Sequence, residues 1–106
     1  MSTCRRHLRA LALAFSMGAL PAHAETITVT IEKMAFSPPE ISASVGDTVQ
    51  WVNKDTFAHT ATVKGEWEVM LSVAKSGSIV LGKVGTLDYF CRFHPNMKGR
   101  IAVSAP

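Results

Sequence analysis

Three side chains near the carboxyl end of the chain are ligands that transition metals accept. Cys91, His94 and Met97 place a thiolate, an imidazole and a thioether at every third position of a short loop between two strand-like segments. Thiolate and thioether sulfur suit the cuprous ion, and imidazole suits both oxidation states of copper. Calcium and magnesium prefer oxygen ligands and do not fit this set. The spacing therefore indicates a copper site that needs a further ligand from elsewhere in the chain.

The first 24 residues have the composition of a cleavable secretory signal peptide. A basic head precedes an apolar run that is too short to span a membrane. The triplet Ala22-His23-Ala24 then forms a small-x-small cleavage site. We expect cleavage after Ala24, which divides the chain into a signal peptide, 1–24, and one domain, 25–106. An uncleaved N-terminal anchor is the alternative, and the Arg5-Arg6 pair leaves open whether export uses the Sec or the twin-arginine route.

Removal of the signal peptide leaves few residues that can complete the copper site. It removes every histidine except His59 and His94, and it leaves Cys91 as the sole cysteine. A blue copper site needs two histidines, one cysteine and a weak axial methionine. We therefore predict one type 1 copper ion bound by four residues, His59, Cys91, His94 and Met97. Taken singly, each has an ordinary alternative: a buried core cysteine, a polar strand histidine, a loop histidine and an apolar methionine.

The basic character of the full chain comes from the predicted signal peptide. Three of the eleven basic residues lie there, so eight basic residues face eight acidic ones in 25–106. A net charge near zero gives no support for binding to nucleic acid or to an anionic membrane. We expect no nucleic-acid partner and no stable membrane insertion after cleavage. A closed four-ligand site offers no open position for a substrate, so we do not expect an enzyme.

Alternating apolar and polar residues recur throughout the predicted domain, as in strands with one buried face. Such runs occupy 27–31, 41–45, 48–52, 57–63, 78–81, 87–91 and 101–103. Glycine, proline, asparagine and aspartate separate them and mark turns. Residues 66–74 alternate without a clear end, which leaves the strand limits within 64–76 open. Seven or so short strands predict an all-β, Greek-key antiparallel sandwich.

The sequence resembles the cupredoxins, the type 1 blue copper proteins, and within them the amicyanin-like group. The short ligand spacing Cys-x-x-His-x-x-Met of residues 91–97 is the loop of that group, and other cupredoxins have longer loops. The matching segments extend through most of the predicted domain. They are 34–41, 45–53, 59–60, 88–91 and 94–99.

The resemblance implies a cupredoxin-like sandwich with copper at one end and a periplasmic carrier that shuttles single electrons by Cu(II)/Cu(I) cycling. It places His59, Cys91, His94 and Met97 on the four ligand positions. It also implies transient docking of periplasmic redox proteins, a donor dehydrogenase and/or a cytochrome c, near His94, and we expect a monomer. A periplasmic copper chaperone or buffer without an electron-carrier role is the alternative, although the predicted domain has no histidine- or methionine-rich tract.

Electrons are expected to leave through His94, whose ring should reach the surface through an apolar rim. The candidate rim residues are Met34, Phe57, Met70, Phe93 and Pro95, each of which could equally be core or incidental surface. Arg92 and Lys98 beside the site could steer an acidic partner.

Four positions depart from the amicyanin-like pattern. Ala58 stands where a proline often precedes the first ligand histidine, and Thr60 stands where amicyanin has asparagine. The pair Arg92-Phe93 replaces a more usual Thr-Pro inside the loop. In the family the position of Thr60 supports the thiolate by hydrogen bonding, so we expect the tuning of the copper to differ here.

Overall fold

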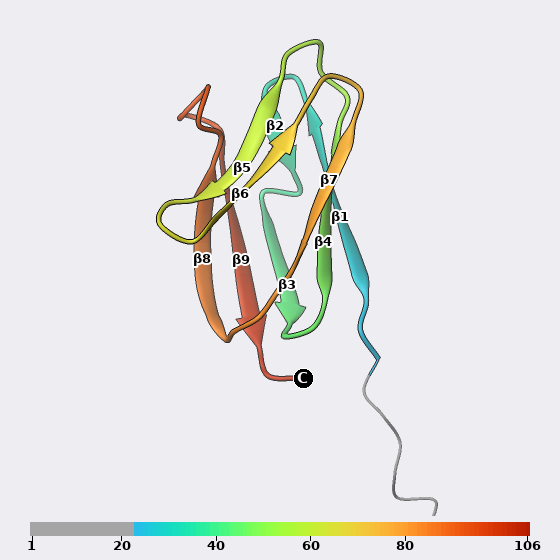
Figure 1. Ribbon diagram of the computed structural model, residues 1–106, viewed down its shortest axis with the longest axis vertical. Helices are drawn as coiled ribbons and strands as arrows, with labels where there is room; N and C mark the ends of the chain where they lie inside the picture. The colour runs from blue at the N-terminus through green and yellow to red at the C-terminus, as the bar shows by residue number, and fades with distance from the viewer. Residues whose placement is uncertain (1–22) are drawn as a thin grey trace, which may run out of the picture.

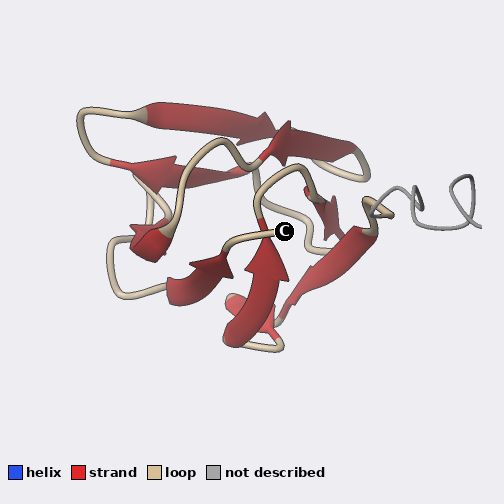
Figure 2. Ribbon diagram, turned by 90° about the horizontal axis from the view of Figure 1, so that it is seen from below, coloured by secondary structure: helices blue, strands red, loops and turns tan. Residues whose placement is uncertain are grey.

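The computed structural model describes residues 23–106, which form nine strands and no helix (Figure 1). The strands are β1 (Thr26–Glu32), β2 (Ala35–Ser37), β3 (Glu40–Ser44), β4 (Thr48–Asn53), β5 (His59–Val63), β6 (Trp67–Leu71), β7 (Ser76–Val80), β8 (Gly85–Phe90) and β9 (Lys98–Ser104). Figure 2 shows these strands joined only by loops and turns. Since this part of the chain holds no helix, it holds none that could span a membrane.

The nine strands form two sheets that face each other as a sandwich. The four-stranded sheet has the order β2-β1-β4-β7, and the five-stranded sheet has the order β3-β9-β8-β5-β6. Two neighbouring pairs, β1 with β4 and β3 with β9, are parallel, whereas the other pairs are antiparallel. Parallel neighbours need a crossover connection instead of a hairpin. Here the chain contributes at least one strand to the opposite sheet between the two members of each parallel pair. The predicted Greek-key sandwich is confirmed, with mixed sheets.

The predicted alternation of residues along the strands accounts for the core. In β4, Val49, Trp51 and Asn53 point inward and are buried, while the residues between them are partly exposed. In β9, Ile101 and Val103 are buried and their neighbours are exposed. Trp51 packs edge-on against Tyr89 with ring centroids 5.4 Å apart. Trp51 lies in β4 and Tyr89 in β8, so this aromatic contact joins the two sheets.

The segment 64–76, whose limits the sequence left open, contains β6 and the loop before β7. β6 is an edge strand that pairs only with β5, and its burial alternates between partly buried and exposed residues. The chain then passes to the other sheet, where β7 pairs with β4. An edge strand lacks the strong apolar contrast of a central strand, which explains why its end could not be read from the pattern.

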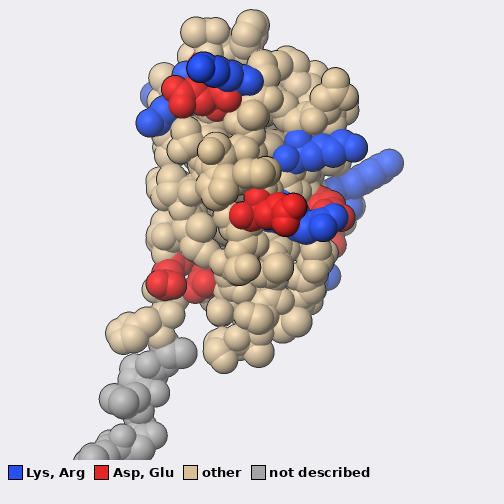
Figure 3. Space-filling model, turned by 180° about the vertical axis from the view of Figure 1, so that it is seen from behind, with Lys and Arg blue, Asp and Glu red and all other residues tan. Residues whose placement is uncertain are grey.

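The predicted signal peptide lies almost entirely outside the described residues, so its cleavage remains a prediction. On the face shown in Figure 3, basic and acidic side chains lie close together. Lys83, Arg92 and Arg100 each form an ion pair with a carboxylate.

Gly99 is required by the packing of Tyr89. The two residues are paired across β8 and β9, and the tyrosine ring lies over the glycine. A Cβ atom at position 99 would lie 2.2 Å from Tyr89 Cζ. The ring is only 2% exposed, and burial raises the pKa of its hydroxyl to about 12. Tyr89 also packs on Trp51 and Phe36, and these contacts restrict the movement of its ring.

We therefore expect Gly99→Ala to lower the free energy of unfolding by about 1–3 kcal/mol or more, the usual cost of overpacking a core. Urea unfolding followed by fluorescence measures this change. Gly82→Ala is the matched control, because a Cβ atom there would meet nothing within 4 Å. Equal stability of the two variants would show that the ring can shift.

Asp47 joins the N-terminal end of β1 to the turn between β3 and β4. Its carboxylate accepts hydrogen bonds from the backbone N–H groups of Glu25 and Ser44, each 2.9 Å long. These two bonds outweigh burial and hold the pKa of Asp47 below its ordinary value of 3.8. A carboxyl group with a lowered pKa in the folded state stabilises the fold above its ordinary pKa, and that contribution is lost as the pH falls through the lowered value.

The free energy of unfolding should therefore be insensitive to this group from neutral pH to about pH 5 and should fall below pH 4. Asp47→Asn should be less stable than the wild type at pH 7, and the difference should shrink toward pH 2. Urea titrations across this range test the prediction, with the exposed Asp88→Asn as control. A difference that does not change with pH would contradict it.

Candidate metal centre

The predicted ligands come from two places that the fold brings to one end of the sandwich, the upper end in Figure 1. His59 is the first residue of β5, and Cys91 directly follows β8. The pairing of these strands aligns Thr62 with Phe90. Because the strands are antiparallel, the start of β5 then lies beside the residues that follow Cys91. His59 is thus brought next to a loop that lies more than thirty positions further along the chain.

Two consecutive turns shape the loop of residues 91–97. The N–H of His94 donates to the carbonyl of Cys91 at 3.2 Å, and the N–H of Met97 donates to the carbonyl of His94 at 2.9 Å. Pro95 occupies the second position of the latter turn, where proline is favoured. The N–H of Cys91 donates to the carbonyl of Met97 at 3.1 Å and closes the loop. The three-residue spacing seen in the sequence is therefore the spacing of successive turns.

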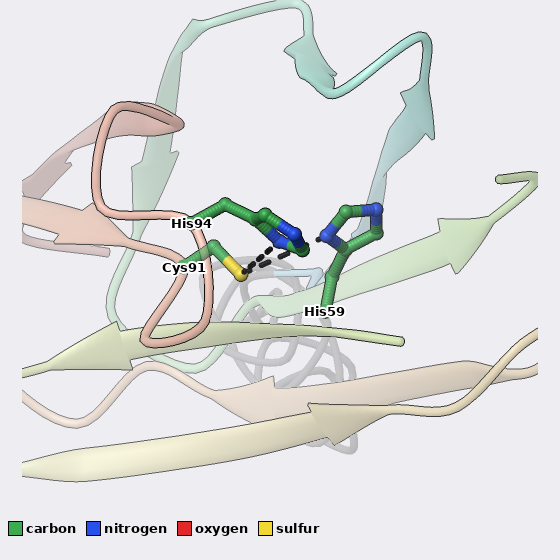
Figure 4. Close-up of side chains that lie close together, drawn as sticks. All are labelled: His59, Cys91 and His94. Carbon is green, nitrogen blue, oxygen red and sulfur yellow. Dashed lines mark hydrogen bonds between the residues drawn. The ribbon is translucent and has the colours of Figure 1, made fainter. Parts of the chain in front are cut away.

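The thiol and the two imidazoles converge on one point (Figure 4). The Cys91 Sγ lies 3.7 Å from the Nδ1 of His59 and 3.7 Å from the Nδ1 of His94. The three donor atoms all lie within 4.8 Å of one another. Atoms about 2.0 and 2.3 Å from a shared ion, the usual imidazole and thiolate distances, are about 3.8 Å apart when the angle at the ion is near 120°. The spacing fits a trigonal metal site.

The fourth predicted ligand, Met97, is the last residue of the same loop and is 4% exposed. His59 and Cys91 are fully buried, whereas His94 is partly exposed. A nitrogen, nitrogen, sulfur and thioether set with little solvent access suits copper better than a hard cation. The donor set and its spacing therefore fit one type 1 copper ion.

Asp55 orients the His59 ring from the side opposite the thiol. Its Oδ2 lies 2.9 Å from the His59 Nε2. The same carboxylate accepts the N–H groups of Lys33 and Met34 in the β1–β2 turn, at 2.8 and 3.0 Å. Partial burial opposes its ionisation, but the bonds from Met34, His59 and Lys33 together hold the pKa of Asp55 below its ordinary value. An ionised Asp55 accepts a hydrogen bond from Nε2–H, and this tautomer leaves Nδ1 free to bind metal.

Asn53 fixes the loop that carries Asp55. Its side-chain amide donates to the carbonyls of Phe57 and Leu71 at 2.8 and 3.0 Å, and its side-chain oxygen accepts the N–H of Asp55. The residue is 1% exposed. The sequence analysis singled out neither Asn53 nor Asp55 as part of the site. A carboxylate four positions before a predicted ligand histidine is the signal that could have found Asp55.

Thr60 and Cys91 are joined by a hydrogen bond in which the backbone N–H of Thr60 donates to the Cys91 Sγ at 3.4 Å. The expectation that this position supports the Cys91 sulfur by hydrogen bonding therefore agrees with the geometry. The donor is the backbone N–H of Thr60 and not its side chain.

Four of the predicted rim residues are exposed, and one of them contacts the partly exposed His94. Met34, Phe57, Met70 and Phe93 are 38–56% exposed, and Phe57 contacts the His94 ring edge-on with centroids 6.2 Å apart. The Arg92 guanidinium is bound bidentately by Glu68. Its charge is therefore compensated, and of the two basic residues singled out for steering, Lys98 is in none of the ion pairs found among the described residues.

The fold and the ligand geometry define a cupredoxin, and a cupredoxin-like domain model matches residues 6–103. The chain belongs to the cupredoxin family. Among curated proteins it is 37% identical over 84 residues to amicyanin from Paracoccus denitrificans, covering 73% of this chain and 64% of that protein. It is 35% identical over 101 residues to amicyanin-alpha from Methylorubrum extorquens, covering 85% of each. The chain thus spans less than two thirds of the Paracoccus denitrificans relative.

Solved structures agree with this assignment. The crystal structure of amicyanin from Paracoccus versutus matches with a TM-score of 0.66 and 35% identity, covering 82% of this chain and 87% of that one. Other matching amicyanin structures are described as Cu(I) forms. The resemblance to the amicyanin-like group is confirmed.

The role of Asp55 predicts a loss of metal affinity when its carboxylate is removed. Asp55→Ala should weaken copper(I) binding about 10–100-fold, the usual effect of losing a partner of a ligand histidine. Competition with a chromophoric chelator measures the affinity. Thr56→Ala changes the exposed neighbour and should bind as the wild type does. Equal affinities for the Asp55 variant and the wild type would mean that the hydrogen bond does not orient His59.

Proposed function

We propose that this chain is a periplasmic blue copper protein that shuttles single electrons between redox partners. The observation that carries the proposal is the convergence of one cysteine sulfur and two histidine Nδ1 atoms, 3.7 Å from sulfur to each nitrogen. The family assignment and the Cu(I) amicyanin structures support copper as the metal. The relatives named amicyanin support a carrier and not an enzyme.

Each predicted ligand has a distinct part in this proposal. His59 and His94 would hold the copper ion through their imidazoles, Cys91 through its thiolate and Met97 through its thioether. Copper bound there supplies a one-electron Cu(II)/Cu(I) couple. The protein keeps the ligands in place: His59 is buried in a central strand with its distal nitrogen bonded to Asp55. Ligands that do not move when the charge changes make electron transfer fast, because little reorganisation is needed.

His94 is the proposed route for electrons into and out of the site. It is the only one of the four ligands that is not buried. The proposed apolar rim consists of the exposed residues Met34, Phe57, Met70, Phe93 and Pro95, of which Phe57 contacts the His94 ring. Weak redox complexes bury little surface, and a small apolar patch suits such brief contacts. A donor dehydrogenase and/or a cytochrome c that docks transiently on this rim is the proposed partner.

The cellular setting follows from the N-terminal sequence. We propose that residues 1–24 form a signal peptide cleaved after Ala24, and that 25–106 forms a monomeric copper-binding domain in the periplasm. A lone cysteine in an oxidising compartment is at risk of oxidation unless a metal or the core protects it. Cys91 is completely buried, which is compatible with both forms of protection.

The proposal predicts an intense visible thiolate-to-copper absorption in the protein loaded with Cu(II). Cys91→Ser should lose this band completely, because a hydroxyl does not replace the thiolate. Met97→Leu is the matched control: it removes only the axial ligand, so the band should remain while the reduction potential shifts. Optical spectra and potentiometry measure both quantities. A colourless copper complex in the wild type would rule out a type 1 site.

A further inference from the structure

Four residues close a ring of hydrogen bonds behind the ligand loop. The backbone N–H of Arg92 donates to the Thr60 Oγ1, and the Thr60 and Thr62 hydroxyls are joined, each at 2.8 Å. The Thr62 hydroxyl donates to the Glu68 Oε1, also at 2.8 Å. The Arg92 guanidinium completes the ring through Nε to Oε1 at 2.9 Å and Nη2 to Oε2 at 3.0 Å. The ring connects β5, the edge strand β6 and the loop.

The direction of each hydrogen bond in the ring follows from the number of hydrogens that each group can donate. The single proton of Thr62 goes to the Glu68 carboxylate, so the hydroxyl of Thr60 must donate to the oxygen of Thr62. The Thr60 oxygen is then free to accept the N–H of Arg92. Donors and acceptors alternate without a conflict, and such chains strengthen one another. Thr60 and Thr62 are buried, which limits competition by water.

The ring touches the metal centre on both sides. Arg92 directly follows Cys91, and Thr60 directly follows His59 and donates its own N–H to the Cys91 sulfur. On the outer side, the Arg92 guanidinium lies 4.7 Å from the centre of the Phe93 ring, which belongs to the apolar rim. Movement of Arg92 would therefore change the position of the Cys91 sulfur and of the Phe93 ring.

We propose that Glu68, through Thr62 and Arg92, is a positioning residue that fixes the Cys91 sulfur relative to His59. Thr60 and Arg92 are two of the positions that depart from the amicyanin-like pattern, and one network accounts for both. An exposed ion pair contributes little to global stability because solvent screens it. The network therefore acts on the geometry of the loop more than on the stability of the fold. The expected effect on copper rests on the proposed function, whereas the ring of hydrogen bonds does not depend on it.

Glu68→Gln tests the proposal. The variant keeps the shape of the side chain but replaces one carboxylate oxygen with an NH2 group, which cannot accept a hydrogen bond from Arg92. Asp88→Asn is the matched control: Asp88 also binds an arginine, Arg100, whose side chain is 53% exposed, as is that of Arg92. In the metal-free protein, hydrogen exchange by NMR should show the Arg92 amide exchanging about tenfold faster in Glu68→Gln and unchanged in the control.

The same variants then receive copper. Copper(I) affinity should fall about tenfold in Glu68→Gln, and the position of the visible Cu(II) band should shift, with the urea midpoint near that of the control. Thr62→Val, which interrupts the buried part of the ring, should show the same pattern. Unchanged Arg92 exchange in both variants would overturn the ring, and faster exchange with an unchanged band and affinity would overturn its positioning role. A wild type without a visible band would contradict the proposed function alone.

Discussion

The proposed copper site depends on the contact between the Cys91 sulfur and the two histidine rings. His94 reaches the sulfur by a local turn, but His59 reaches it only when β5 pairs with β8 in the register that aligns Thr62 with Phe90. A slip of one residue would turn His59 to the other face of the sheet. The metal centre is thus a consequence of correct sheet pairing. Metal binding should in turn favour the folded state, because the unfolded chain has no such arrangement.

The two histidines have different environments, and this difference suits them to different roles in the proposed site. His59 is buried, lies in a central strand and is bonded through Nε2 to Asp55, which also holds the β1–β2 turn. His94 lies in a loop, is partly exposed and contacts Phe57. The first arrangement resists movement, and the second gives partners access. Behind the loop, the ring that contains Glu68 and Arg92 adds a restraint on Cys91 from a third direction.

The fold class could be predicted from the alternation of period two along the strands. The candidate ligands Cys91, His94 and Met97 could be singled out from their short spacing, and His59 because it is the other histidine of residues 25–106. The supporting residues could not. Asn53 and Asp55 looked like an ordinary polar loop, and Glu68 lay in the segment whose strand limits were unreadable. Their partners are distant in the sequence: Asp55 binds a turn about twenty positions earlier, and Arg92 binds Glu68 at a separation of 24. Parallel pairing of β1 with β4 is likewise invisible in the alternation, which is the same for either direction.

In the proposed function, this cupredoxin holds one copper ion in the same ligands while the ion gains and loses one electron. Spectroelectrochemical titration of the copper-loaded protein tests this directly. We expect the visible band to bleach and return along a single one-electron curve, over repeated cycles and with a copper chelator present. Loss of copper to the chelator on reduction, so that the band does not return, would contradict a carrier and favour a copper chaperone or buffer.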